Sequence, residues 1–510
     1  EYRRQRQMCI RDRSFGDAAT SAPVIVIASG VRAGTIAVTN SLGNVILTNG
    51  SISGLSFTDS GSGSLTVYSV LTVTNALTVT GTNEAVFAAN LVAGSLLMNG
   101  GGTLTLLGSN TIGSSILTFG SIAIGNNAAF GSGTVAFEGN GTVSALDSLR
   151  VANDYLISNG VRATFDPGDF VLENTGTISG QGSLNKAGAG TLILSGSNSY
   201  SGGTLISTGT LSAAAINALG AGTVTLTNSG STLDYRLGSS TLSLGGLVLS
   251  GGTTVSLVQG GSISNSGNVV LANSTNFISL QGTWETEGSN LLISGGSIIG
   301  TNYVALVYGS HTVSLGGVFT NNTSFRYTFT NTPTSLDLVT ELLQLYWNTN
   351  LAKGSWNYTD PNWVLQNQGG AVSFTSNSFV KFISAATVTV ADTGVTAGGI
   401  TVANPGGSLI LQGTGTISAQ DLTNSGSGSL IVHNVLMLSN ALSITAKNTS
   451  IFHTNVSASS LTMNGAGTLA LSGSNSFGSV SVTDGCVILS NNYSLGSNAV
   501  SLTNATLTTT

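Results

Sequence analysis

The sequence is poor in charge, cysteine and long hydrophobic runs. Only 7% of its 510 residues are Asp, Glu, Lys or Arg, against roughly 25% in an ordinary globular domain. Its mean hydropathy of +0.32 indicates enough apolar surface to bury, which argues against the highly charged class of disordered chains. Gly, Ser, Thr or Asn interrupts each apolar run before it reaches the roughly 18 residues of a membrane helix. The sequence therefore predicts a folded chain without a transmembrane helix.

The scarce basic residues are unevenly distributed. The formal net charge is -6, and five of the 14 Lys and Arg residues fall in the first thirteen positions, EYRRQRQMCIRDR. Because this segment differs in composition from everything after it, we interpret residues 1–13 as a non-native scar; a basic nucleic-acid-binding arm is the alternative. The rest of the chain has no basic stripe that could neutralise phosphates, so we expect no nucleic-acid partner.

Cysteine is equally scarce. The two cysteines are Cys9 and Cys486, and the first lies inside the predicted scar. Without that segment Cys486 is alone, which predicts neither an intrachain disulfide nor a CxxC metal site.

The main positive feature is a long internal repeat. Residues 52–145 align with residues 417–510 at a constant offset of 365 positions, and SGSGSL begins at both Ser60 and Ser425. Such self-similarity is typical of stacked architectures, in which each unit buries its face only against its neighbours. We predict a first module at residues 14–343 and part of a second at residues 344–510.

A shorter pattern, G-x-G-T-L-x-L-x-G-x-N, occurs three times, beginning at Gly100, Gly188 and Gly465. The TLxL core alternates with a period of 2, so both leucines should face inward while Thr and the variable residue face outward. The variable residue is Thr105, Ile193 or Ala470. We expect the flanking Gly and Asn to supply the left-handed backbone of tight turns.

Short strands separated by one or two turn residues cannot form useful antiparallel hairpins. They predict an all-β fold, a right-handed, single-stranded parallel β-helix (β-solenoid). We expect it to be elongated, with roughly 20 residues per coil.

Two segments resemble a known family. Residues 188–211, GAGTLILSGSNSYSGGTLISTGTL, are similar to the autotransporter-associated β-strand repeat, also called the passenger-associated transport repeat. The segment with Trp347, Trp356 and Trp363 resembles the opening of such modules, where these side chains would cap or brace a coil. By this resemblance the first module is truncated at its N-terminal end and the second at its C-terminal end, so we expect an internal fragment of a longer protein.

The resemblance implies a structural stalk or adhesin-like passenger region of a bacterial surface or secreted protein. Its location would be extracellular or on the outer-membrane surface. Its partners would be host or matrix surface glycans or proteins, and it would meet a membrane only through regions outside this sequence.

The alternative function is a polysaccharide-degrading β-helix enzyme, either a lyase or a glycoside hydrolase. A glycosidase needs two carboxylates flanking the scissile bond, and the densest acidic group, accompanied by Arg162, is the best candidate. This acidic group comprises Asp154, Asp166, Asp169 and Glu173. Because Asp166-Pro167-Gly168-Asp169 is also ordinary turn chemistry, we favour a solvated loop.

Other candidates for chemistry are weaker. His311, His433 and His453 lie in separate segments without an HxH or HxxxH pairing, and we expect each to be isolated. Ser195 and Ser472 lack a nearby His and Asp in sequence and are interpreted as turn residues. A sugar-stacking strip of Trp347, Trp356 and Trp363 is the alternative to bracing, which is the favoured role. We therefore predict no enzyme activity, no catalytic residue, no cofactor and no metal site.

Overall fold

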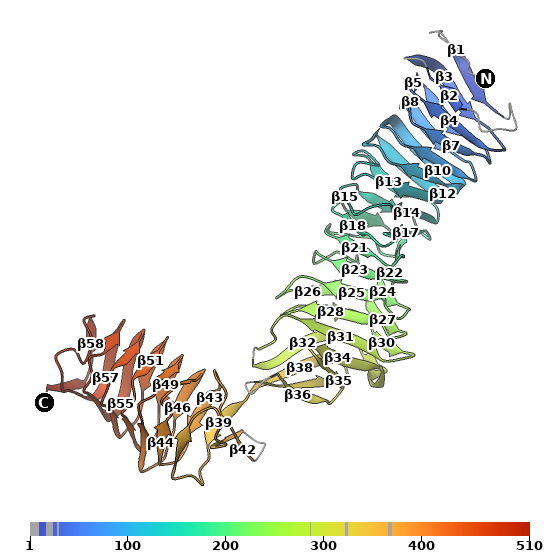
Figure 1. Cartoon of the computed structure of the whole chain (residues 1–510). Helices are drawn as coiled ribbons and strands as arrows, with labels where there is room; N and C mark the ends of the chain where they lie inside the picture. Colours follow the sequence, from blue (N-terminus) through green and yellow to red (C-terminus); the bar gives the residue numbers. More distant parts are fainter. Residues whose placement is uncertain are drawn as a thin grey trace. The chain divides into compact units, whose positions relative to one another are not determined.

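The computed structural model describes residues 10–16, 24–27, 30–285, 287–321, 325–365 and 370–509. The chain divides into two compact units (Figure 1). The first unit comprises the residues up to Val318 together with Thr328–Val339, and the second comprises Phe319–Tyr327 and the residues from Thr340 onward. The module boundaries predicted from the repeat remain a prediction.

Within the described ranges the chain forms 59 strands, one short 3-10 helix, η1 (Thr301–Tyr303), and no α-helix. Most strands pair in parallel with the strand one coil before and one coil after, which makes a β-solenoid of about 24 turns. The predicted parallel β-solenoid is confirmed.

The first strands of unit 1 are β1 (Ile10–Phe15), β2 (Val24–Val26), β3 (Val31–Val38), β4 (Asn44–Thr48), β5 (Ser51–Gly54), β6 (Ser56–Asp59), β7 (Ser64–Val67), β8 (Val70–Val79), β9 (Glu84–Phe87), β10 (Leu91–Leu106), β11 (Thr111–Ile112), β12 (Ser114–Ile124), β13 (Thr134–Phe137) and β14 (Gly141–Ala145). The next are β15 (Leu149–Val151), β16 (Tyr155–Ile157), β17 (Arg162–Asp166), β18 (Val171–Asn174), β19 (Ile178–Gly180), β20 (Ser183–Lys186), β21 (Thr191–Leu194), β22 (Thr204–Ile206), β23 (Thr210–Ala213), β24 (Thr223–Leu226), β25 (Thr232–Tyr235), β26 (Thr241–Leu244), β27 (Gly246–Ser250), β28 (Thr254–Val258), β29 (Ser262–Asn265), β30 (Val269–Ala272), β31 (Asn276–Gln281), β32 (Gly288–Ser294), β33 (Ile298–Ile299), β34 (Val304–Tyr308) and β35 (His311–Ser314).

The stretch in which the chain passes from one unit to the other contains β36 (Val318–Asn321), β37 (Phe325–Asn331) and β38 (Ser335–Leu342). The strands of unit 2 are β39 (Gln344–Trp347), β40 (Lys353–Trp356), β41 (Trp363–Leu365), β42 (Ala371–Val372), β43 (Phe379–Phe382), β44 (Ala386–Val390), β45 (Val395–Thr396), β46 (Gly399–Val402), β47 (Ser408–Gln412), β48 (Ile417–Ala419), β49 (Asp421–Asn424), β50 (Ser429–Val432), β51 (Leu436–Leu438), β52 (Ala441–Ile444), β53 (Thr449–Phe452), β54 (Val456–Ala458), β55 (Ser460–Leu471), β56 (Ser476–Phe477), β57 (Val480–Leu489), β58 (Val500–Leu502) and β59 (Ala505–Thr509).

A coil contributes up to three short strands, each to a different wall of the stack. Strands β16, β17 and β18 form one such coil, and β19, β20 and β21 lie directly above them in parallel register. Leu104 pairs with Ile122 in the following coil, whereas Leu226 pairs with Leu249, so the second of these coils is longer than the first. The expected coil length is therefore an average of unequal turns.

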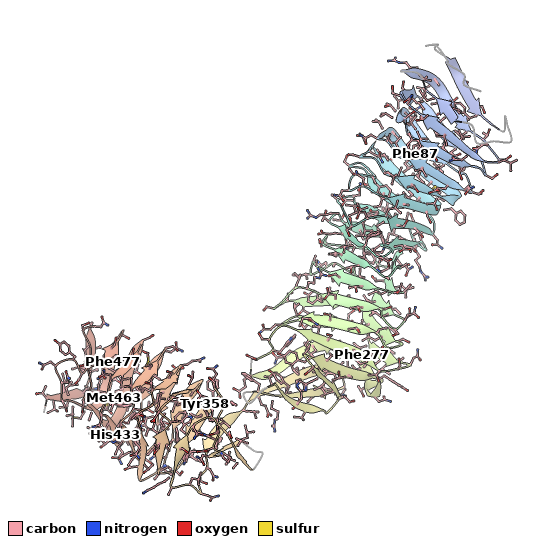
Figure 2. All side chains as sticks on the ribbon, viewed as in Figure 1. Phe87, Phe277, Tyr358, His433, Met463 and Phe477 are labelled. Atoms are coloured by element: carbon pink, nitrogen blue, oxygen red, sulfur yellow. The ribbon has the colours of Figure 1, made fainter. Side chains whose placement is uncertain are left out.

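Along most strands the side chains alternate between the interior and the surface of the stack. Figure 2 draws these side chains on the ribbon. In β21, Leu192 and Leu194 are fully buried, whereas Ile193 between them is only half-buried. The predicted inward leucines are thus confirmed. The outward residue of the first copy, Thr105, is nevertheless only 6% exposed, so the predicted outer position is buried in that copy.

The glycines of the repeated pattern have a different role from the one expected. Among them only Gly188 has a left-handed φ, of 72°. A Cβ on Gly190 would lie 2.1 Å from the carbonyl oxygen of Phe170 in the preceding coil, and one on Gly102 would lie 1.9 Å from that of Asn83. These glycines are required because successive coils approach too closely for any side chain, and the expectation of left-handed turns was wrong for them.

The final Asn of the pattern also differs from expectation, since none of its copies has a positive φ. The Oδ1 of Asn198 accepts a hydrogen bond from the backbone N–H of Ile178 at 2.7 Å, and its Nδ2 donates to the carbonyl of Ala218 at 2.5 Å. Asn110 and Asn475 each make the same two bonds, to one coil before and one coil after. Each asparagine therefore ties three successive coils together.

Antiparallel strands accompany the parallel stack in both units. In unit 1, β34 forms a hairpin with β35, and in unit 2, β41 pairs in antiparallel fashion with both β39 and β42. At the other end of unit 1, β1 pairs in parallel with β3. Residues 10–13 of the predicted scar lie in β1, while residues 1–9 lie outside the described residues, so the scar also remains a prediction.

Candidate functional site

The acidic group predicted from the sequence lies on and next to strands β16, β17 and β18. Asp154 precedes β16, where its Oδ1 accepts hydrogen bonds from the backbone N–H and the hydroxyl of Thr177 at 2.7 and 2.8 Å. These bonds, the backbone one first, lower the pKa of the Asp154 carboxyl. Asp154 is therefore held as a carboxylate that links two coils.

The other members of the acidic group lie on different strands. Glu173 is on β18, where it pairs with Arg150 at 3.2 Å and accepts a hydrogen bond from the Ser195 hydroxyl at 2.8 Å. Asp166 ends β17, and its Oδ1 accepts the backbone N–H of Gly168 at 2.8 Å, as expected for a turn. Asp169 lies in the following turn. Asp154 and Glu173 thus bond to groups of adjacent coils, whereas Asp166 and Asp169 belong to a single turn.

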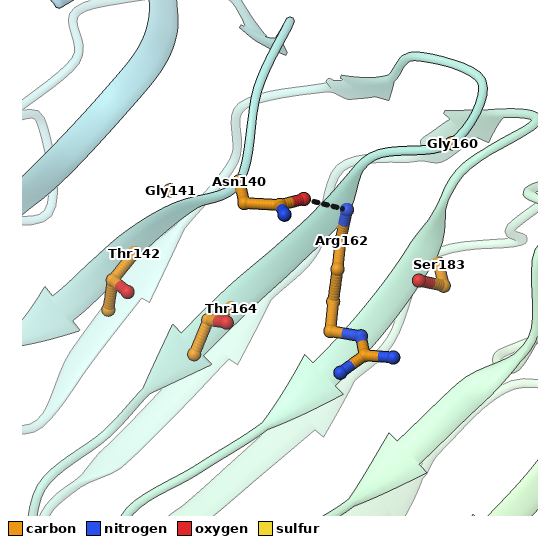
Figure 3. Close-up of a pocket in the computed structure, with 7 residues that line it drawn as sticks. All are labelled: Asn140, Gly141, Thr142, Gly160, Arg162, Thr164 and Ser183. Carbon is orange, nitrogen blue, oxygen red and sulfur yellow. Dashed lines mark hydrogen bonds between the residues drawn. The ribbon is translucent and has the colours of Figure 1, made fainter.

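Arg162, at the start of β17, lines a shallow polar hollow of about 380 Å³. The residues lining it are Asn140, Gly141, Thr142, Gly160, Arg162, Thr164 and Ser183. Figure 3 shows the Arg162 side chain extending over the sheet between Thr164 and Ser183. The Oδ1 of Asn140 accepts the backbone N–H of Arg162 at 2.8 Å and so positions the start of β17.

The hollow was missed at the sequence level because its parts come from three successive coils. Thr142 lies beside Thr164 in the register of β14 and β17, and Arg162 lies beside Ser183 in the register of β17 and β20. In the sequence, the members of each pair are separated by the length of one coil. Only a known coil length could have revealed it.

Two of the three histidines are neighbours, which corrects the prediction that each is isolated. His433 and His453 follow equivalent strands, β50 and β53, and their rings stack with centroids 4.5 Å apart and planes 6° apart. Partial burial lowers the pKa of His433, and the neighbouring ring of His453 lowers it further. Because one coil separates the two histidines in the sequence, their pairing follows from the register.

The three tryptophans of unit 2 brace its first coils. Trp347, Trp356 and Trp363 are at most 1% exposed. The ring centroid of Trp363 lies 5.2 Å from that of Trp347, 5.2 Å from that of Trp356 and 5.4 Å from that of Phe382. Buried rings of this kind stabilise a core and present no face to a sugar, so the stacking strip is excluded and the bracing role is confirmed.

A lysine and an aspartate are buried in the interior of unit 1. Lys186 is 0% exposed, in a column that otherwise contains apolar residues such as Phe165 and Ile206. Its Nζ donates to the carbonyls of Ala187, Gly188 and Thr208 at 2.8, 2.8 and 3.1 Å. Burial lowers the pKa of Lys186 to about 8. All three donors of the ammonium are satisfied, so Lys186 is a structural clamp.

Asp59 is the second buried group. It is 2% exposed, and burial raises the pKa of its carboxyl to about 6. Its equivalent in the long repeat is Asn424, whose Nδ2 donates to the Ser450 hydroxyl at 2.8 Å. Asp59 is thus a carboxyl at a position where the other module has an amide.

Within the described residues, no group of three or more His, Cys, Asp or Glu side chains could hold a metal ion. Cys486 is a free thiol, and Cys9 lies outside the described residues. None of the helices found in the described ranges has the length and apolar character needed to cross a membrane.

The stacked parallel strands of both units form a repeat scaffold. The family model for the passenger-associated-transport-repeat matches residues 184–213 and 461–487, which contain the second and third copies of the short pattern. The chain therefore carries this repeat, and the predicted resemblance is confirmed.

One curated relative supports the same assignment. The chain is 30% identical over 332 residues to the adhesin BmaC autotransporter of Brucella suis biovar 1 (strain 1330). The match covers 56% of this chain and 8% of the relative, so the chain spans only a small part of that protein. No solved structure matches the chain significantly.

Proposed function

We propose that this chain is a stalk or adhesin-like segment of a bacterial passenger, located on the outer surface of the cell or in the extracellular space, with no catalysis of its own. The observation that supports this most is the 30% identity over 332 residues to an autotransporter named as an adhesin. The fold agrees with it, because a solenoid holds an extended surface on a core that needs only neighbouring coils.

The bonding of the acidic residues within the chain supports a non-catalytic role. Asp154 and Glu173 are each bonded to groups in adjacent coils, and Asp166 caps its own turn. A hydrolase would need two carboxylates facing one another across a substrate groove. Partners of the proposed segment would be glycans or proteins of a host surface or matrix.

The proposal can be tested by display. The chain is fused between a secretion signal and an autotransporter translocator and expressed in a non-adherent bacterium. We expect a folded, protease-resistant product on the cell surface. Binding to glycan-coated or matrix-coated plates, compared with the translocator alone, then separates an adhesin from a pure stalk. A chain that is degraded or retained inside the cell contradicts the proposal.

The enzyme alternative is tested by turnover. The purified chain is incubated with pectins, glucans and alginate, and we expect no release of reducing or unsaturated sugars. Turnover that Asp166→Asn or Asp169→Asn abolishes would favour the polysaccharide-degrading enzyme over the stalk.

A further inference from the structure

The hollow around Arg162 combines a charged group with a concave, polar surface. We propose that it binds a sugar residue that carries an oxyanion, a carboxylate or a sulfate, within a surface or matrix glycan. This inference rests on the proposed surface function and names the class of ligand.

The charge of Arg162 is available to a ligand. Arg150, Arg236 and Arg326 each form an ion pair with a carboxylate of this chain, whereas Arg162 forms none with any carboxylate that the structure describes. Its side chain is exposed, and its hydrogen bond to Asn140 uses the backbone N–H and leaves the guanidinium out. A guanidinium binds a carboxylate or sulfate through two parallel N–H donors, which makes an oxyanion its natural ligand.

The surroundings of Arg162 favour a sugar over a peptide. Thr142, Thr164 and Ser183 place hydroxyl groups around the guanidinium, and no large apolar side chain lines the hollow. Hydroxyl groups both donate and accept hydrogen bonds, as do the hydroxyls of a sugar ring. A peptide side chain would find little apolar surface to bury.

The size of the hollow agrees with a small ligand group. Its volume of about 380 Å³ lies at the lower end of the range for small-molecule sites, about 300 to 1,000 Å³. Gly160 forms one edge with φ of 76°, and no atom lies within 4 Å of the position its Cβ would take. The absence of a side chain there leaves the entrance open to a longer oligosaccharide.

The nearest acidic residue on the same strand does not cancel this charge. Asp166 is four residues beyond Arg162 on β17, which corresponds to about 13 Å along an extended strand. This separation exceeds the Debye length of about 8 Å at physiological ionic strength. The repulsion of an oxyanion at Arg162 by Asp166 is therefore largely screened.

The test measures binding of the whole chain to immobilised oligosaccharides by surface plasmon resonance. The probes are hyaluronan oligomers with carboxylates, heparin oligomers with sulfates, and neutral dextran, with inorganic sulfate as a soluble competitor. We expect the chain to bind at least one acidic oligomer and not dextran. Arg162→Gln should weaken that binding about tenfold or more, since it removes a charge-assisted pair.

Two further variants make the result specific. Thr164→Val removes a hydroxyl at nearly constant shape and should weaken binding about threefold. Arg32→Gln removes the same charge from an exposed site on β3 and should change binding less than about twofold. Circular dichroism and thermal melting verify that each variant is folded.

Three outcomes would overturn the inference. Failure to bind any acidic oligomer removes the site but leaves the stalk function intact. Equal weakening by Arg162→Gln and Arg32→Gln would indicate unspecific attraction of charge. Competition by inorganic sulfate as strong as that by the free oligomer would indicate an anion site without recognition of the sugar. Failed surface display, in contrast, contradicts the proposed function itself.

Discussion

Adjacent side chains of β21 have similar size but different surroundings. Leu192 is fully buried between Leu172 and Leu211 of the neighbouring coils, while Ile193 lies half-buried on the outer face. Leu192→Ala should leave a cavity and lower the free energy of unfolding by about 2 to 5 kcal/mol. Ile193→Thr should lower it by less than about 1 kcal/mol. Denaturant unfolding of both variants measures the difference, and equal losses would indicate that both faces are buried.

Asp59 should make unit 1 sensitive to pH. Because burial raises the pKa of its carboxyl to about 6, the folded chain binds the proton more tightly than the unfolded chain, whose Asp has a pKa of about 3.9. The contribution of Asp59 to the free energy of unfolding is thus fully present below pH of about 4 and is lost as the pH rises through about 6. Asp59→Asn removes this loss, because Asn carries no charge at any pH.

We expect Asp59→Asn to raise the free energy of unfolding by about 2 to 3 kcal/mol at pH 7.5, as two pKa units correspond to about 2.7 kcal/mol. The difference should shrink toward zero below pH of about 4. Urea unfolding at several pH values measures it. A gain that is independent of pH would show that the carboxyl of Asp59 is not the cause.

Two glycine substitutions distinguish two reasons for a glycine in the coils, which are close approach of the neighbouring coil and a left-handed backbone. Neither Gly190 nor Gly406 has a left-handed φ. A Cβ on Gly190 would lie 2.1 Å from the Phe170 carbonyl oxygen, whereas one on Gly406 would meet nothing within 4 Å. Gly190→Ala should therefore destabilise by about 2 kcal/mol or more through overpacking. Gly406→Ala should be neutral or slightly stabilising, and thermal melting of both variants decides between the two explanations.

The asparagine at the end of the repeated pattern acts on whole coils. Asn198 bonds to Ile178 in the preceding coil and to Ala218 in the following coil, and it is only 5% exposed. Asn198→Ala removes two buried hydrogen bonds and leaves their backbone partners unsatisfied, which should cost about 2 to 4 kcal/mol. Ser197→Ala, at an exposed neighbour, should change stability by less than about 0.5 kcal/mol. Similar effects of the two variants in chemical unfolding would contradict the clamp.

The direction of side chains within a strand could be predicted from the sequence, whereas contacts between coils could not. The inward direction of Leu192 follows from a period of 2, which depends only on local geometry. The clamp of Asn198, the pairing of His433 with His453 and the hollow at Arg162 depend on which residues meet across coils. Because successive coils differ in length along the chain, an average period cannot assign these contacts.

Among the described parallel strands of unit 1, pairing is with the coils directly before and after. Leu192, for example, has Leu172 and Leu211 as its register partners on that wall. In such a stack stability is the sum of local coil terms and nearest-neighbour terms. A lesion in one coil should therefore loosen nearby coils first and leave distant ones protected.

Hydrogen exchange of the Leu192→Ala variant, followed by mass spectrometry, tests this nearest-neighbour stacking most directly. We predict faster amide exchange than in the unsubstituted chain at residues 180–215, while the exchange of residues 400–480 in unit 2 is unchanged. Ile193→Thr, on the outer face of the same strand, serves as the control and should change neither region. Uniform acceleration over both regions would contradict the stack and indicate one cooperative core.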